Sequence, residues 1–285
     1  MVTDRIIEQM EKGIIPWQKP WSGVGLLDGG AVNYVTRKPY SLLNQMLLGR
    51  KGEYLTFKQV KALGGDIKKG AKSSMVVFFT MAAYKDQKSE ESEVKDKLKT
   101  FPLLRYYRVF HLDDTTGIES KMPKEEETKE DQLKPVEAAE AIINGYLSRE
   151  SGLKFQNDKP SAQAYYSPAL DEVVVPMMSQ YAIVEEYYST TFHELTHSTM
   201  KRGRCDRKSE NKFAAFGNEE YSREELVAEI GSAMLCNHAG LDNEKAFKNS
   251  VAYIQGWLSH LKDDNKAIVW AASRAEAAAK YIIGE

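Results

Sequence analysis

Hydrophobic positions along the chain recur at helical spacing in some segments and cluster as short apolar or β-branched runs in others. We expect helices over residues 2–13, 42–48, 58–63, 135–150, 180–201, 222–237, 243–261 and 264–283. We expect strands over residues 54–57, 75–80, 103–112, 162–167 and 172–175. This order predicts an α+β protein, in which a mixed α+β part is followed by a mainly helical part with a small β-sheet.

Two polar stretches interrupt the pattern. Residues 85–100 are rich in Lys, Glu, Asp and Ser, which is typical of a surface loop, and residues 119–133 combine Pro123 with a run of Glu and Lys. A chain of 285 residues exceeds the usual length of one domain. We therefore predict an N-terminal domain (1–118), a polar linker (119–133) and a C-terminal domain (134–285).

The segment His193-Glu194-Leu195-Thr196-His197 carries the clearest chemical signal. Residues four apart share one face of a helix, so both histidines can point a ring nitrogen at one metal ion. Glu194 is displaced from that face, where it can accept a proton from a water molecule that the metal activates. The same pattern also fits two surface histidines near the end of a helix.

A following helix offers the third ligand that such a zinc site needs. Glu225 and Glu229 are four residues apart and share a face of the predicted helix 222–237. We assign Glu225 as the third ligand and Glu229 as a carboxylate that accepts a hydrogen bond from a ligand histidine. The expected cofactor is one Zn²⁺ ion per chain, with other divalent transition metals as alternatives.

The beginning of this helix is expected to be capped. Ser222 and Glu225 have the spacing of a capping box. Arg223 and Glu224 are interpreted as a solvated polar edge of an amphipathic helix.

Composition places few limits on function. Hydrophobic residues make up 42% of the chain and charged residues 28%, which is ordinary for a soluble protein. No apolar run approaches a membrane span, no hydrophobic signal segment begins the chain, and two cysteines form no disulfide framework, so we expect a cytoplasmic protein. Residues 1–110 carry 19 Lys or Arg against 11 Asp or Glu, whereas the whole chain has a net charge of −2. This asymmetry suggests that the first part meets a polyanion.

Motifs in both halves together resemble the ArdC-type antirestriction proteins of conjugative plasmids and other mobile elements. The matching segments are 13–21, Asn33, 37–40, Asn44, 55–59, 68–70, 107–110, 187–199 and 224–231. The resemblance implies an N-terminal domain that binds single-stranded DNA with little sequence preference. It also implies a C-terminal zincin-like metallopeptidase domain and protection of incoming DNA from host restriction. His111 stands where the family pattern leads us to expect Asn, so nothing is transferred from that position.

A non-specific single-strand binder needs cations for phosphates and exposed rings for base stacking. The residues that we predict to contact DNA are Trp17, Lys19, Trp21, Arg37, Lys38, Tyr40, Lys58, Lys68, Lys69 and Lys72. The alternative for Tyr40 is a core position, and the two tryptophans can instead close a lid over the N-terminal helix. Single-stranded DNA is the expected partner, bound without sequence specificity, and duplex DNA is a further candidate.

The resulting hypothesis is a zinc-dependent peptidase that hydrolyses a host protein and is joined to a DNA-binding domain. Strand 172–175 could pair with an extended substrate, and Tyr187, Tyr188, Tyr221 and His238 are available to stabilise an oxyanion. The alternative is a DNA-shielding protein whose zincin domain is structural or binds a partner without cleavage. Nuclease chemistry ranks low, because Mg²⁺ sites for phosphodiester cleavage favour oxygen ligands over two histidines.

Overall fold

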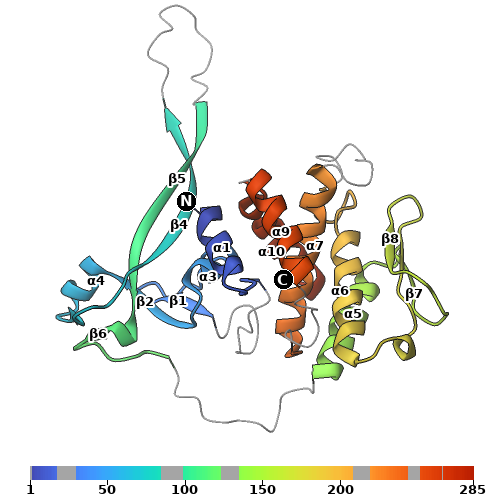
Figure 1. Cartoon of the computed structure of the whole chain (residues 1–285), viewed down its shortest axis with the longest axis horizontal. Coiled ribbons are helices and arrows are strands. Elements are labelled where there is room, and N and C mark those ends of the chain that lie inside the picture. The colour runs from blue at the N-terminus through green and yellow to red at the C-terminus, as the bar shows by residue number, and fades with distance from the viewer. Residues whose placement is uncertain are drawn as a thin grey trace, which may run out of the picture. The chain divides into compact units, whose positions relative to one another are not determined.

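The computed structural model describes residues 2–17, 30–84, 99–122, 135–207, 219–242, 251–264 and 266–285. These residues form the α+β protein that the sequence predicts, with long helices and small sheets (Figure 1). Their contacts define two compact units: unit 1 comprises residues 1–31, 39–51 and 123–285, and unit 2 comprises residues 32–38 and 52–122.

These contact units do not coincide with the predicted domains, because α1 (Val2–Glu11) and α3 (Leu42–Leu48) of the N-terminal part belong to unit 1. Most of the predicted linker lies outside the described residues, as does most of the loop predicted at 85–100. No helix within the described ranges is both long and apolar enough to cross a membrane.

Unit 2 is built on a four-stranded sheet with the order β1-β2-β5-β4, beside a two-stranded sheet of β3 and β6. Its elements are β1 (Ala31–Asn33), β2 (Gly52–Thr56), α4 (Phe57–Ala62), β3 (Asp66–Ile67), β4 (Ser74–Tyr84), β5 (Lys99–His111), η1 (Leu112–Asp114) and β6 (Thr115–Thr116). A small core of Tyr34, Leu55, Val60 and Leu112 fixes α4 against the sheet. The predicted passage from strand to helix is confirmed, and Thr56 and Gln59 form a reciprocal capping box there.

Strands β4 and β5 extend well beyond the rest of this sheet. β2 pairs only with Val109–His111 of β5, whereas β4 pairs with β5 along its whole length. The segments Met75–Tyr84 and Lys99–Arg108 therefore form a twisted two-stranded ribbon, which Figure 1 shows projecting from the sheet. We refer to these two segments as the ribbon.

His111, where the family pattern suggests Asn, has a structural role in unit 2. Its Nδ1 atom accepts a hydrogen bond of 3.1 Å from the Asp113 backbone and so caps η1. The imidazole is buried edge-on against Tyr54, with 5.0 Å between ring centroids, and a Cβ atom at Gly52 would lie 2.3 Å from its Nε2 atom. Gly52 thus provides the space that the imidazole ring needs.

Unit 1 is mainly helical and has one three-stranded sheet with the order β7-β9-β8. Its elements are α1 (Val2–Glu11), α3 (Leu42–Leu48), α5 (Pro135–Arg149), β7 (Lys154–Gln156), β8 (Tyr165–Ser167), β9 (Glu172–Val174), η2 (Met178–Gln180), α6 (Val184–Ser198), α7 (Glu219–Ala239), α9 (Val251–Asp263) and α10 (Ala267–Ile283). α10 packs against α7, α5, α3 and α6 through buried alanines, whose small side chains permit a close approach.

Two local predictions for unit 1 need correction. α7 begins at Glu219, so Ser222 lies inside the helix and does not cap it. The helix around the histidines begins at Val184 rather than at residue 180, because η2 and an extended Ile183 precede it. Strand β7 is too short to show a period in the sequence and was not predicted.

The interface between α6 and α7 is unusually close. A Cβ atom on Gly231 of α7 would lie 2.7 Å from Thr196 Cγ2 of α6, and Thr196 is fully buried. The next residue of α7, Ser232, donates a hydrogen bond of 2.6 Å from its hydroxyl to the Ser189 carbonyl of α6. Small residues on α7 therefore set the distance between the two helices.

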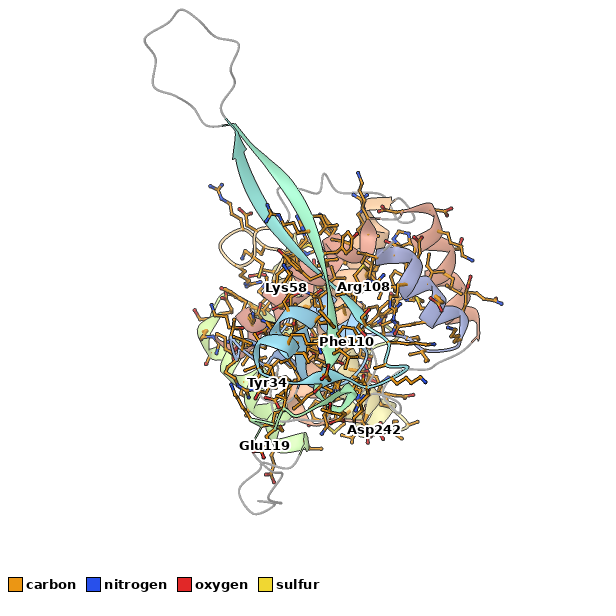
Figure 2. All side chains as sticks on the ribbon, turned by 90° about the vertical axis from the view of Figure 1, so that its left-hand side faces the viewer. Tyr34, Lys58, Arg108, Phe110, Glu119 and Asp242 are labelled. Atoms are coloured by element: carbon orange, nitrogen blue, oxygen red, sulfur yellow. The ribbon has the colours of Figure 1, made fainter. Side chains whose placement is uncertain are left out.

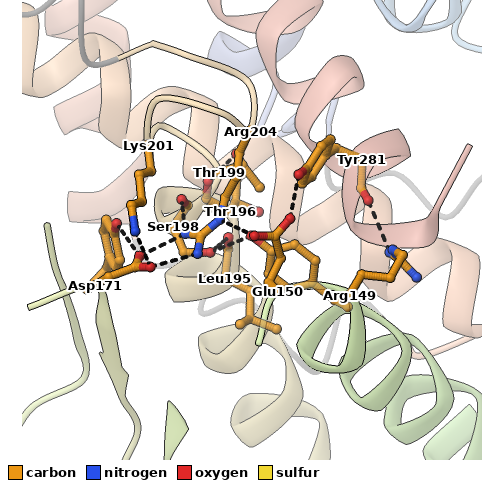
Figure 3. Close-up of polar contacts among 12 residues, drawn as sticks. Arg149, Glu150, Asp171, Leu195, Thr196, Ser198, Thr199, Lys201, Arg204 and Tyr281 are labelled. Carbon is orange, nitrogen blue, oxygen red and sulfur yellow. Dashed lines mark hydrogen bonds and ion pairs between the residues drawn. The ribbon is translucent and has the colours of Figure 1, made fainter. Parts of the chain in front are cut away.

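A buried polar cluster holds the end of α6 in place (Figure 3). Arg204 donates to both carboxylate oxygens of Asp171 at 2.9 and 2.8 Å, to Glu150 at 2.9 Å and to the Ser198 carbonyl at 2.8 Å. These contacts connect the β8–β9 turn, the end of α5 and the last turn of α6. Lys201 adds a 2.6 Å contact to Asp171. Burial opposes ionisation of Asp171, but the contacts with Arg204 and Lys201 outweigh burial and lower the pKa of this carboxyl.

Replacement of Gly231 by Ala tests the helix spacing. The new Cβ must displace Thr196, so we expect the free energy of unfolding to fall by about 1–2 kcal/mol despite the better helix propensity of Ala. Gly256→Ala is the matched control, because Gly256 is exposed in α9 with nothing within 4 Å of its Cβ position, and it should stabilise by up to about 1 kcal/mol. Urea unfolding measures both, and equal stabilisation by the two changes would contradict the close packing.

Candidate metal centre

Helices α6 and α7 bring three side chains with metal-ligating atoms to one point. His193 and His197 of α6 face each other with 3.1 Å between their Nε2 atoms. Glu225 of α7 places one carboxylate oxygen 3.4 Å from His193 Nε2 and the other 3.4 Å from His197 Nε2. The structure thus places the three predicted ligands together, with a ligand atom of each within 4.8 Å of the others.

The spacing of these atoms fits a small divalent cation. Tetrahedral bonds of about 2.0–2.1 Å to nitrogen and oxygen put neighbouring donor atoms roughly 3.3 Å apart. The observed separations of 3.1 and 3.4 Å agree with that value. Two imidazoles and one carboxylate are also a donor set that transition-metal ions accept readily.

The electrostatics of the site favour a cation. Burial opposes the charged form of His197, but contacts with Glu224 and Glu225 outweigh burial and raise the pKa of His197 to about 10. Burial likewise opposes ionisation of Glu225, yet the two histidines hold the pKa of Glu225 well below its usual range. The carboxylates that stabilise a proton on His197 would also stabilise a metal ion in its place.

Each histidine also has a carboxylate beside its Nδ1 atom. Glu229, which we predicted to contact a ligand histidine, lies 3.9 Å from His193 Nδ1. This is the ring nitrogen that does not face Glu225. Glu224 lies 3.6 Å from His197 Nδ1. Both distances exceed a normal hydrogen bond, but each carboxylate lies on the Nδ1 side of its ring, while Nε2 of each ring faces Glu225.

The interpretation of Glu224 as a solvated edge residue was wrong. Glu224 is only 5% exposed, and its carboxylate receives hydrogen bonds of 3.1 and 2.7 Å from the equally buried Arg207. The sequence contains a signal that we did not use: Glu224 precedes Val227, Ala228 and Gly231 by three, four and seven residues, which places it on the buried face of α7.

Arg207 also secures the end of α6. Its guanidinium donates to the Thr196 carbonyl at 2.9 Å and to the Thr199 hydroxyl at 2.7 Å. The carbonyls in the last turn of a helix have no intrahelical partner, and a buried cation is favourable there. Arg207 therefore links the turn that carries His197 to the carboxylate that faces His197.

Glu194 lies next to the cluster in a buried position. Its side chain is 8% exposed, and burial raises its pKa, with a further rise caused by the charge of Glu225. The charges of His197 and His193 act in the opposite direction, as does a hydrogen bond from the Tyr166 backbone in β8, but burial outweighs them. A carboxyl group with a raised pKa is suited to take up and return a proton near neutral pH.

The prediction that strand 172–175 pairs with an extended substrate was wrong. Residues 172–174 form β9, which is the central strand of the sheet and pairs with both β7 and β8. Strand β8 (Tyr165–Ser167) is at the edge of the sheet and is the strand that contacts Glu194. An extended peptide could add only to such an edge.

The structure describes the surroundings of three of the four residues suggested for oxyanion stabilisation, and none of the three is well placed for this role. Tyr187 and Tyr188 are buried, and their hydroxyls bond to Asn157 and Glu140. His238 is 13 residues beyond Glu225 on the same helix, or about 20 Å along the axis. The side chain of Tyr221 lies outside the described residues.

Tyr181, which sequence reasoning did not single out, is a better candidate. Its side chain is half-buried, with the ring against Tyr187. Burial raises the pKa of Tyr181, and the negative charge of Glu194 adds to this rise. The charge of Glu194 acts on Tyr181, so the Tyr181 hydroxyl lies within electrostatic range of the proposed proton-transfer group. The signal in the sequence was weak, because Tyr181 precedes α6 and has no fixed helical spacing to the histidines.

The residues predicted to contact DNA divide into three groups. Trp17 is 1% exposed and Tyr40 is 8% exposed, so neither ring has a free face, and the prediction that they stack on bases is incompatible with the structure. Lys19 and Trp21 lie outside the described residues. The remaining six side chains are exposed: Arg37, Lys38, Lys58, Lys68, Lys69 and Lys72.

Two of these six cations have partners within unit 2. Arg37 pairs with the buried Glu53, and Lys68 donates a 2.6 Å hydrogen bond to the Asp113 carbonyl. Partial neutralisation of Arg37 reduces what it can offer to a phosphate.

Two family models match the chain. Residues 1–110 match the N-terminal domain of anti-restriction factor ArdC, and residues 138–274 match a zincin-like metallopeptidase model. The metal-free crystal structure of the antirestriction ArdC protein from plasmid R388 is 31% identical, covers 99% of this chain and 94% of that chain, and superposes with a TM-score of 0.73. The Mn(II)-bound structure of the R388 protein gives a TM-score of 0.70 at the same identity, over 99% of this chain and 95% of that chain.

Curated relatives include longer proteins. DNA primase TraC of Escherichia coli is 28% identical over 297 residues, which cover 99% of this chain but only 20% of the primase. A second TraC primase of Escherichia coli is 29% identical, and the match covers 26% of its length. Protein y4eC of Sinorhizobium fredii (strain NBRC 101917 / NGR234) is 28% identical over 99% of this chain and 90% of its own length. The chain thus spans about a fifth to a quarter of the two primases.

The likeness to the R388 protein extends over nearly the whole of both chains at 31% identity, and each half also matches a family model. The chain therefore belongs to the ArdC family of antirestriction proteins, with an ArdC-type N-terminal domain followed by a zincin-like metallopeptidase domain.

Proposed function

We propose that this chain is an antirestriction protein of a mobile genetic element that binds single-stranded DNA without sequence preference and hydrolyses peptide bonds of a host protein. The convergence of His193, His197 and Glu225 beside the buried Glu194 carries the peptidase part of the proposal. Membership of the ArdC family supports the antirestriction role. A host restriction protein is the proposed substrate.

The proposed cofactor is one Zn²⁺ ion per chain. His193, His197 and Glu225 would hold the ion, and their donor spacing supports this assignment. The R388 relative has been crystallised with Mn(II), so the proposal extends to other divalent transition metals. When bound, the ion would polarise the scissile carbonyl and make a water molecule more acidic.

Glu194 is the proposed general base and acid. Its carboxylate accepts a proton from the attacking water and returns that proton to the leaving amine. Burial raises its pKa, which favours this exchange near neutral pH. The Tyr166 backbone hydrogen bond restrains the carboxylate, and the Tyr181 hydroxyl is our candidate for the group that stabilises the oxyanion.

The edge strand β8 is the proposed binding place for the substrate backbone. Its Tyr166 backbone bonds to Glu194, so a peptide paired with this edge would run next to the proton-transfer group. Backbone pairing recognises extended chains with little regard for their sequence, which suits hydrolysis of an exposed or partly unfolded segment.

The proposed DNA contacts lie in unit 2. The described residues of this unit include 11 Lys or Arg and 5 Asp or Glu, which gives an excess of positive charge. Lys38, Lys58, Lys69 and Lys72 are exposed, and we propose that they contact phosphates. Binding by such contacts is independent of base sequence.

The change Glu194→Gln tests the peptidase mechanism. The amide keeps the shape of the side chain but cannot accept the proton, so we expect hydrolysis of a fluorogenic peptide library to fall by about 10²–10⁴-fold. Metal content, measured by mass spectrometry of the purified protein, should stay that of the unmodified chain.

The same variant separates the proposal from its alternative, a DNA shield with a non-catalytic zincin domain. If Glu194→Gln hydrolyses peptides at the unmodified rate, the proposed role of Glu194 is wrong. If neither protein cleaves any peptide while both protect DNA from restriction equally, the shield is the better account.

Paired substitutions test whether the buried contact between Arg207 and Glu224 positions His197. The double change Arg207→Met, Glu224→Leu removes both charges together, so the protein should still fold. Without the carboxylate beside His197 Nδ1, we expect metal affinity to fall about 10–100-fold.

The matched control is Arg223→Gln, Asp264→Asn, which removes the ion pair that the adjacent residue of α7 makes with Asp264, just beyond α9. Its metal affinity, measured by calorimetric titration with Zn²⁺, should stay within about threefold of the unmodified protein. Equal affinities for the two double variants would show that Arg207 and Glu224 act on stability alone.

A further inference from the structure

The β4–β5 ribbon exposes aromatic rings that packing within unit 2 does not explain. Phe78 is 46% exposed, Tyr106 59% and Tyr107 44%. Single exposed apolar residues are common on protein surfaces, but three exposed rings on one pair of adjacent strands form a concentration. Because β2 pairs only with the last residues of β5, no third strand of the described sheet continues beside this part of the ribbon.

The strand register places the rings on both faces of the ribbon. Phe78 is opposite Arg105, and Val76 is opposite Tyr107, so Phe78, Arg105 and Tyr107 share one face. The rings of Phe78 and Tyr107 meet edge to face with 5.6 Å between their centroids. Tyr106 lies on the opposite face, which it shares with Arg108.

The charge of the ribbon has one sign. Strands β4 and β5 contain Lys99, Arg105 and Arg108 and no Asp or Glu. The side chains of Arg105 and Arg108 are exposed, and Figure 2 labels Arg108 on the ribbon. A surface of rings and arginines without acids is complementary to a ligand that offers both flat apolar faces and negative charge.

Single-stranded DNA has both features. Its unpaired bases offer ring faces to aromatic side chains, and its phosphates attract arginines. In a duplex the bases stack on one another, so their faces are not available without unpairing. Trp17 and Tyr40 are buried and cannot supply rings, whereas the ribbon can.

We propose that the ribbon is the base-stacking surface for single-stranded DNA, with bases against Tyr106, Tyr107 and Phe78 and phosphates against Arg105 and Arg108. This inference rests on the proposed DNA-binding function and specifies its location. The lysines of unit 2 supply long-range attraction, and the ribbon supplies the discrimination between single and double strands.

Fluorescence anisotropy with a labelled 20-nucleotide oligo(dT), an abasic strand of equal length and a 20-base-pair duplex tests the proposal. The double change Tyr106→Leu, Tyr107→Leu removes both rings but keeps apolar side chains. We expect it to weaken oligo(dT) binding by at least about tenfold and to remove the preference over the abasic strand. The control Tyr106→Phe, Tyr107→Phe keeps the rings and should stay within about twofold of the unmodified protein.

The arginines are tested by their salt dependence. The double change Arg105→Gln, Arg108→Gln should reduce the slope of log affinity against log salt concentration by about 1.4, as expected for two lost phosphate contacts on a single strand. Bromodeoxyuridine strands provide a measurement without substitution, since their photocrosslinks to the unmodified protein should map to the ribbon.

The results that would overturn the ribbon proposal differ from those that would overturn the proposed DNA-binding function. If the Leu variant keeps full affinity and the preference for oligo(dT), or if crosslinks map only elsewhere, the ribbon is not the stacking surface, although DNA binding stands. If the Leu variant loses self-association in sedimentation while oligo(dT) binding is unchanged, the ribbon is an interface with a second copy of the chain. If the unmodified protein does not bind oligo(dT), DNA binding and the ribbon proposal both fail.

Discussion

The close packing of α6 against α7 is the constraint on which the candidate metal centre depends. Gly231 leaves no room for a larger residue beside Thr196, and Thr196 directly precedes His197. Because the third donor, Glu225, comes from α7, a small increase in helix separation would move its carboxylate away from both histidines. Donor spacings near 3.4 Å tolerate little displacement. A larger residue at Gly231 would therefore be expected to disturb the arrangement of the three metal-ligating side chains.

Three carboxylates of α7 surround the two histidines and lie on both sides of each imidazole ring. Glu225 faces both Nε2 atoms, while Glu224 and Glu229 face the two Nδ1 atoms from the same helix. So many carboxylates would repel one another in a buried site without cations. Arg207 compensates Glu224, and the remaining negative charge is what a divalent ion would neutralise. One helix thus supplies both the ligand and the groups that orient the other ligands.

Periodicity in the sequence predicted most of the helices and the three metal-site residues, because helical spacing relates residues four apart directly. It did not predict which strand is at a sheet edge, since pairing of β9 with β7 and β8 depends on contacts distant in sequence. Glu224 was misinterpreted because a charged residue was assumed to be solvated, although its position relative to Val227 and Gly231 is that of a buried residue. Trp17 was misplaced for the converse reason: an aromatic ring beside cationic residues was assumed to be exposed.

The most direct test of the central claim is X-ray anomalous scattering from crystals loaded with Zn²⁺ or Mn²⁺. The account predicts one ion per chain, bound by Nε2 of His193, Nε2 of His197 and the Glu225 carboxylate at about 2.0–2.2 Å. An ion bound elsewhere, or a coordination shell that lacks one of these three side chains, would contradict it.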